Sequence, residues 1–187
     1  MTSVKLVNSS VDGNVVGGNN YEITIHPSAP NPELLKGAIK QLETFCEQDE
    51  EFVDFLERFD HYTSDRSGRP VIGLEAKLRN GNREDLIESA IEQKDRFVKK
   101  ISRGQLASRR QYVYYYILQK LDTQFHVQIV PLLKVGAPPH AIDAAIYNEI
   151  VSSVYSEALQ VDPSIDMQLI YGMLYFLTGK CHLVWES

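Results

Sequence analysis

Seven basic residues fall between residues 94 and 110 of the 187-residue chain, and only Asp95 opposes them. Three consecutive tyrosines, Tyr114 to Tyr116, follow this basic window. Lysine and arginine bind phosphates, and aromatic rings stack on nucleic-acid bases. Nucleic-acid binding is therefore the alternative function that we carry forward, with these candidate residues: Lys99, Lys100, Arg103, Arg109 and Arg110.

The basic window can also be explained without nucleic acid, as the partner of acidic residues in the protein. Residues 43–60 contain eight acidic residues, which we interpret as the solvated face of a helix. The bases can pair with these acids within one chain or between subunits. A formal net charge of −6 and a pI near 5.4 argue against nucleic-acid binding along the whole chain, but they allow a local basic patch.

No other group of residues has the spacing of a catalytic or metal site. Asp122 and His126 stand one helical turn apart and can form a hydrogen bond, but two ligands are too few for a metal site. The glycine-rich stretch at residues 12–18 lacks the Gly-Lys-Ser/Thr ending of a phosphate loop and is typical of turns. No Gly-x-Ser-x-Gly nucleophile motif occurs. We predict a protein that is not an enzyme, with no catalytic residue, metal or cofactor.

Composition points to a cytoplasmic protein. Cys46 and Cys181 are far apart, without the spacing of metal ligands, as expected of free thiols in a reducing compartment. The N-terminus lacks the basic-then-apolar pattern of a signal peptide. No run approaches the roughly 18 apolar residues that a membrane helix needs, so we predict no membrane association.

The first 32 residues predict strands and a linker. Asp12-Gly13 and the turn at residues 17–20 separate short apolar segments, and Tyr21, Ile23 and Ile25 alternate with polar residues. We predict a β-hairpin or meander over residues 1–26 and a proline-rich linker over 27–32. Exposed strand edges can pair between chains, so this segment is also a possible oligomerisation element and we expect a homo-oligomer.

Residues 33–187 predict a helical domain, so the expected fold is mainly α, in an α+β arrangement with the N-terminal meander. Apolar residues recur at helical spacing in two segments before a polar loop at residues 62–70. The pattern then predicts a break near residues 80–82, a long helix from Ser108 that ends before Pro131, another helix after Pro138-Pro139, and a last helix that ends at Gly179.

The C-terminus is unusually apolar and aromatic for a chain end. Such a segment is expected to pack into the core or into a partner, and aromatic side chains are typical anchors of interfaces. The candidate partner-binding residues are Tyr175, Phe176 and Trp185, with a core role as the alternative.

This ending resembles C-terminal domains of bacterial ABC-three component conflict systems. The resemblance rests on residues 172–182, Gly-Met-Leu-Tyr-Phe-Leu-Thr-Gly-Lys-Cys-His, with Trp185, and on residues 115–121, Tyr-Tyr-Ile-Leu-Gln-Lys-Leu. It covers roughly residues 80 to 187. Residues 13–19, Gly-Asn-Val-Val-Gly-Gly-Asn, also look like short Gly/Asn-rich leaders found before domains of bacterial immune proteins.

The resemblance implies a helical recruitment module that links an effector to an ABC-type or SMC-like ATPase. Family members usually carry an effector domain in front of this module, whereas here we find no nuclease, protease or NADase signature. The expected function is therefore a non-enzymatic adaptor, or accessory subunit, of an anti-phage defence assembly. Its partner is expected to be an ATPase or an effector.

Overall fold

Most of the residues that the computed structural model describes are helical; the described residues are 33, 36–37, 59–68, 72–102 and 108–186. No strand occurs among these residues, which confirms the helical prediction for them. The predicted meander at 1–26 and the linker at 27–32 lie outside the described residues.

In chain order the elements are α3 (Gly73–Asn80), the 3-10 turn η1 (Glu84–Leu86), α4 (Ile87–Ser102), α5 (Ser108–Gln124), the π-helical turn η2 (Phe125–Ile129), α6 (Val130–Lys134), α7 (Pro139–Ala145), the π-helical turn η3 (Ile146–Val151), α8 (Ser152–Ala158) and α9 (Met167–Gly179).

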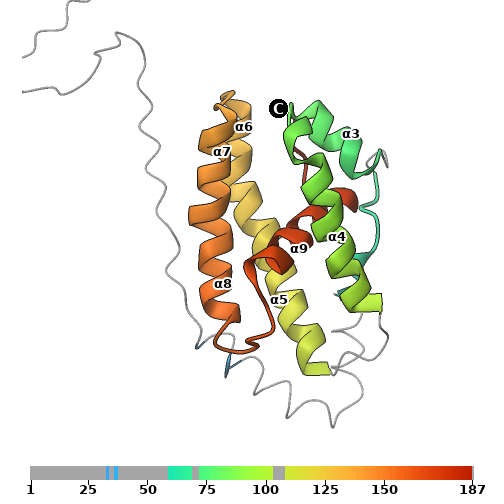
Figure 1. Cartoon of the computed structure of the whole chain (residues 1–187), viewed down its shortest axis with the longest axis vertical. Helices are drawn as coiled ribbons and strands as arrows, with labels where there is room; N and C mark the ends of the chain where they lie inside the picture. Colours follow the sequence, from blue (N-terminus) through green and yellow to red (C-terminus); the bar gives the residue numbers. More distant parts are fainter. Residues whose placement is uncertain (1–32, 34–35, 38–58, 69–71, 103–107, 187) are drawn as a thin grey trace, which may run out of the picture.

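Two long helices run side by side in opposite directions (Figure 1). The first joins α5, η2 and α6, and the second joins α7, η3 and α8. The prediction that the first helix ends before Pro131 is wrong, because the helix continues to Lys134. The π-helical turn η2 precedes Pro131 and changes the hydrogen-bond register. Pro131 then falls in the first turn of α6, where its missing N–H is tolerated.

The last helix, α9, lies between α4 and the two long helices (Figure 1). Nine of its thirteen residues are buried, because apolar side chains occupy nearly every face of the helix. A helix surrounded in this way organises the core, since each neighbouring helix packs its apolar stripe against it. The predicted break near residues 80–82 is also confirmed: α3 ends at Asn80, and Asn82 has a positive φ of 54°.

Helices α4 and α9 approach so closely that one position between them has no room for a side chain. A Cβ atom added to Gly172 of α9 would lie 2.3 Å from the carbonyl oxygen of Gln93 in α4. Real Cβ contacts are never this short, so glycine allows the two backbones to touch. This contact fixes the position of α4 against α9, and it therefore helps to determine which side chains of α4 face outward.

After α9 the chain reverses and returns to the core. Trp185 is 2% exposed, and its indole Nε1 donates a hydrogen bond of 3.0 Å to Oγ1 of Thr178. Its ring centroid lies 5.4 Å from that of Phe125 and 6.4 Å from that of Tyr175. The guanidinium carbon of Arg83 lies 5.8 Å from the indole centroid, a cation–π distance. The C-terminus therefore joins residues from α9, η2 and the turn after α3.

Candidate interaction surface

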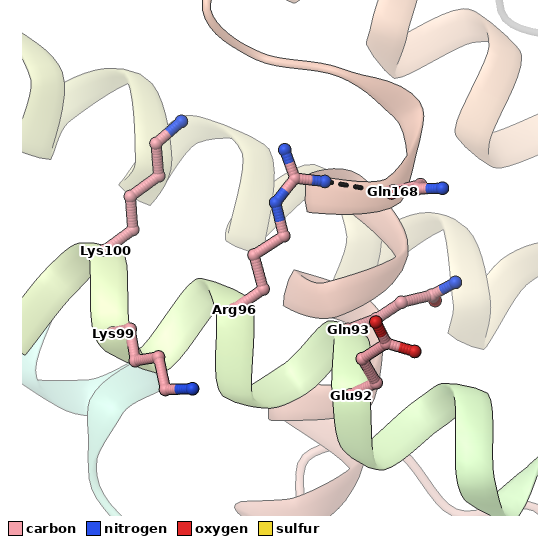
Figure 2. A pocket seen from close by; sticks show the side chains of 6 residues that line it. All are labelled: Glu92, Gln93, Arg96, Lys99, Lys100 and Gln168. Atoms are coloured by element: carbon pink, nitrogen blue, oxygen red, sulfur yellow. Dashed lines mark hydrogen bonds between the residues drawn. The ribbon is translucent and has the colours of Figure 1, made fainter.

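One outward face of α4, together with the start of α9, forms a cleft of about 440 Å³. We call it the α4 cleft. Positions one and two helical turns apart share a face of a helix, which explains why residues from three turns of α4 meet here. The cleft is lined by Glu92, Gln93, Arg96, Lys99 and Lys100 of α4 and by Gln168 of α9 (Figure 2).

Arg96 connects the two helices of the α4 cleft. Its guanidinium donates to both carboxylate oxygens of Asp166, at 2.6 and 3.3 Å, and to Oε1 of Gln168 at 3.0 Å. A paired contact of this kind fixes direction as well as distance. Arg96 is therefore held against the start of α9 (Figure 2).

Asp166 has a second role as the N-cap of α9. Its Oδ1 accepts a hydrogen bond of 2.8 Å from the backbone N–H of Leu169. Desolvation raises the pKa of Asp166, but the Leu169 N–H and the Arg96 guanidinium outweigh it, so the pKa lies below its ordinary value. The carboxylate is thus the common partner of a helix end and of a cleft residue.

The loop before α9 engages two more cations. Lys100 donates to the carbonyl oxygen of Ser164 at 3.2 Å, and Arg110 lies 3.3 Å from the carboxylate of Asp162. Desolvation lowers the pKa of Lys100 in spite of the nearby carboxylates of Asp162 and Asp166. The Lys100 ammonium is therefore a partly dehydrated charge at the edge of the α4 cleft.

The basic window predicted from the sequence is thus largely tied to the loop before α9. Among its described members, Arg96, Lys100 and Arg110 have partners there, whereas Lys99 is exposed and makes no hydrogen bond or ion pair with the described residues. Arg109 lies in α5, and Arg103 lies outside the described residues. The acids of residues 43–58 lie outside them as well. Nucleic-acid binding by the window stays a prediction.

The three predicted anchors of a partner interface lie in the core. Tyr175, Phe176 and Trp185 are 4%, 5% and 2% exposed. Phe176 packs edge-on against Phe97 of α4, with 5.1 Å between the ring centroids. Direct contact of these side chains with a partner would require α9 or the C-terminal turn to open, so their partner-binding role stays a prediction.

A buried ion pair between the two long helices was not singled out from the sequence. Glu157 of α8, whose side chain is 2% exposed, pairs with Lys120 of α5. It also accepts a hydrogen bond of 3.0 Å from the hydroxyl of Tyr116. The hydroxyl's pKa rises to about 12, through desolvation first and the Glu157 charge second. The sequence did offer one signal for this pair: Lys120 is a charged residue within the apolar stripe of the predicted helix that begins at Ser108.

Asp122 and His126 do form a contact, as their spacing allows. Nδ1 of His126 lies 3.3 Å from Oδ1 of Asp122 and 2.8 Å from its carbonyl oxygen. Within the described residues, no three histidine, cysteine, aspartate or glutamate side chains are grouped so that they could hold a metal ion. The same part of the chain contains no helix with the length and apolar character needed to cross a bilayer.

Replacing Asp166 with alanine should lower the free energy of unfolding by about 1–2 kcal/mol, since it removes the N-cap acceptor of α9. Asp166→Asn keeps a capping oxygen and serves as the matched control, with a loss within about 0.5 kcal/mol. Urea unfolding followed by circular dichroism measures both. Equal losses in the two variants would contradict the capping role.

The sign of the pH dependence follows from the lowered pKa of Asp166. Its charge stabilises the fold above the unfolded-state pKa of about 3.9, and this stabilisation is lost as the pH falls through the lower folded-state pKa. The wild-type protein should therefore lose more stability than Asp166→Asn as the pH falls below about 4.

A model of a known protein family matches most of the described chain. The model of C-terminal domain 9 of the ABC-three component systems matches residues 73–185, which is more than half of the chain and extends from the start of α3 to Trp185. The match includes both stretches that carried the C-terminal resemblance, and it confirms that resemblance. Neither the curated proteins nor the solved structures contain a match.

Proposed function

Because the chain belongs to the C-terminal domain 9 family of the ABC-three component systems, we propose that it is a non-enzymatic adaptor of a bacterial anti-phage defence assembly. In this role it binds a partner ATPase or an effector. The single observation that carries the proposal is the family match, because it spans the helical bundle from α3 to the C-terminal turn. The family is a domain of a multi-component system, and such a domain needs a surface that binds another component.

The contacts of the described residues favour binding over catalysis. Shifted pKa values often mark catalytic groups, but they also arise in structural networks. Here the carboxylates of Asp162 and Asp166 bind a backbone N–H and an arginine each, and the Tyr116 hydroxyl binds Glu157. A structural partner contributes to each of these pKa shifts, and for the Tyr116 hydroxyl desolvation by burial contributes most. The α4 cleft, by contrast, exposes polar groups at the surface.

The proposal keeps the predicted division of the chain. Residues 33–187 form the recruitment domain, and residues 1–26 supply strands for assembly into a homo-oligomer, with residues 27–32 as the linker between them. If Tyr175, Phe176 and Trp185 also contact the partner, they do so by opening from the core. The helical part is the one supported by the family match.

Affinity purification tests the adaptor role. The full chain, tagged and expressed in its native cells, should enrich an ABC-type ATPase in quantitative mass spectrometry, compared with untagged cells. Nuclease treatment of the lysate removes complexes bridged by nucleic acid, and the enrichment should survive it. Recovery of the chain without any ATPase or effector would contradict the adaptor role.

The alternative function is nucleic-acid binding through Lys99, Lys100, Arg103, Arg109 and Arg110. Affinity would then fall steeply with added salt, since each neutralised phosphate releases counterions. Recovery of nucleic acid as the sole partner in the same purification would support this alternative. The adaptor is the leading proposal, because Lys100 and Arg110 already bind the loop before α9.

A further inference from the structure

Residues 59–66 pack against the turn that follows α9, and we call this segment the clasp. The backbone N–H of Arg66 donates a hydrogen bond of 2.9 Å to the carbonyl oxygen of Lys180. In the opposite direction, Nε2 of His182 donates to the carbonyl oxygen of Ser64 at 3.3 Å. The family match begins only at α3, so the clasp is a segment outside the family domain that the end of that domain holds.

The clasp has little buried surface of its own. Among its residues, all of which the structure describes, Tyr62 is the buried one, at 8% exposure. The Tyr62 ring lies 5.9 Å from that of Tyr115 in α5 and 5.3 Å from that of His182, between centroids. Segments with few buried apolar contacts open at a lower free energy than the core does. We therefore expect the clasp to open locally, while the helical bundle stays folded.

The turn that the clasp holds is strained. Cys181 has a positive φ of 65°, which is unfavourable for a residue with a side chain. The backbone N–H of His182 bonds the carbonyl oxygen of Leu177 at 2.9 Å, the pattern with which many helices end on a glycine. Strained residues of this kind often occur in segments that switch between two states. The clasp contacts both neighbours of Cys181, so it stabilises the strained turn.

His182 is the titratable group at the centre of this contact. The residue is 0% exposed, and the edge of its ring meets that of His61, with 5.2 Å between the centroids. Titratable and charged groups face it from two elements, the clasp with His61, Tyr62 and Arg66 and α5 with Tyr115 and Asp122.

The surroundings of His182 favour its neutral form. Desolvation lowers its pKa most, and the charges of His61 and Arg66 lower it further. The Ser64 carbonyl and the Asp122 carboxylate act in the opposite direction but do not outweigh these effects, so the pKa lies below its ordinary value. Protonation would add a charge and a second N–H, at Nδ1, to a ring that is removed from water.

The direction of the pH effect follows from this lowered pKa. When the clasp opens, His61 and Arg66 move away and water reaches His182, so the open state binds the proton more tightly. The closed state therefore keeps its full stability above the ordinary histidine pKa of about 6.5 and loses stability as the pH falls below it.

We propose that residues 59–66 form a pH-sensitive clasp, which is closed while His182 is neutral and opens when His182 is protonated. Opening uncovers the ring of Tyr115 and releases the chain at residue 59 from the turn after α9. Residues 1–58 lead directly into the clasp, so their attachment to the bundle at this point depends on pH. This inference goes beyond the proposed adaptor function, and its test requires no partner.

Hydrogen–deuterium exchange of the full chain, read by mass spectrometry, tests the clasp at about pH 7.5 and about pH 5.5, on either side of the ordinary histidine pKa. Opening that takes up one proton can change the opening equilibrium by up to about tenfold per pH unit. After correction for the intrinsic exchange rate, the protection of clasp peptides should fall about threefold to tenfold at the lower pH. Peptides from α9 should keep their protection.

His182→Gln tests the titrating group, because glutamine keeps an N–H for the Ser64 carbonyl but does not titrate. The protection of its clasp peptides should change by less than about 1.5-fold between the two pH values. His140→Gln, at an exposed histidine of α7, is the matched control and should behave as the wild type does. If His182→Gln does not fold, the exposed His61→Gln replaces it, and the pH effect should shrink to about twofold because one repelling neighbour is gone.

Tyr62→Ala tests whether the clasp opens by itself. The variant removes the buried side chain of the clasp, so clasp peptides should lose about tenfold or more of their protection at neutral pH while α9 peptides lose none. Equal losses in the clasp and in α9 would show that the two unfold together, and the proposal would then be wrong. Clasp protection in the wild type that is the same at both pH values, or the same pH effect in His182→Gln and His140→Gln, would also contradict it.

Discussion

Replacing Trp185 with alanine is expected to lower the free energy of unfolding by about 3–5 kcal/mol, the usual cost of removing a large aromatic side chain from a core. The indole is 2% exposed and packs against Phe125 and Tyr175. Its loss also removes the hydrogen bond from Nε1 to Thr178. A domain is usually stable by about 5–15 kcal/mol, so this single change can unfold a large fraction of the molecules.

Urea unfolding followed by far-ultraviolet circular dichroism measures the loss, because Trp185 is the chain's one tryptophan and its fluorescence disappears in the variant. Trp185→Phe is the matched control. It keeps an aromatic ring beside Phe125 and Tyr175 but leaves Oγ1 of Thr178 without its donor, for a smaller loss of about 1–2 kcal/mol. A loss below about 1 kcal/mol in Trp185→Ala would contradict the core role and favour the predicted interface role.

Replacing Glu157 with alanine is the second change with a large expected effect, a loss of about 3–5 kcal/mol. The substitution leaves the Lys120 ammonium, which is 17% exposed, without its carboxylate partner between α5 and α8. It also removes the acceptor of the Tyr116 hydroxyl. The cost comes mainly from the charge left behind, because desolvation of an unpaired ion is expensive.

The double variant Lys120→Met/Glu157→Leu distinguishes the ion pair from simple packing. It replaces both charges with apolar side chains of similar volume, and such exchanges are often neutral or stabilising. We expect the double variant to be at least about 2 kcal/mol more stable than Glu157→Ala in the same urea titration. If both variants lose the same free energy of unfolding, the ion pair does not explain the loss, and the change in side-chain volume alone accounts for it.

Much of the helical pattern could be predicted from the sequence. Apolar spacing predicted the long helices and the last helix, and local turn residues predicted the break near residues 80–82 and the end at Gly179. These features depend on residues a few positions apart. The π-helical turn before Pro131 could not be predicted in this way, because proline alone indicates a helix end and the changed hydrogen-bond register leaves no clear sequence signal.

The candidate site was predicted in part. The basic window was recognised by composition, and Lys99 and Lys100 do line the α4 cleft. Gln93 also lines the cleft and was not singled out, because a glutamine on a helix face looks like any solvated residue. Its position against α9 depends on the close contact of its backbone carbonyl with Gly172, which lies far away in the sequence.

By itself, the sequence determined a helical C-terminal region, the helix ends near residue 80 and at Gly179, its family and the place of its positive charge. These follow from local spacing, local capping and motif identity. Only the tertiary structure decided how those residues are used. It brings Arg96 to Asp166 across seventy positions of the chain and buries Trp185 between η2 and α9. Partners and burial depend on which surfaces pack together, and distant parts of the chain decide that jointly.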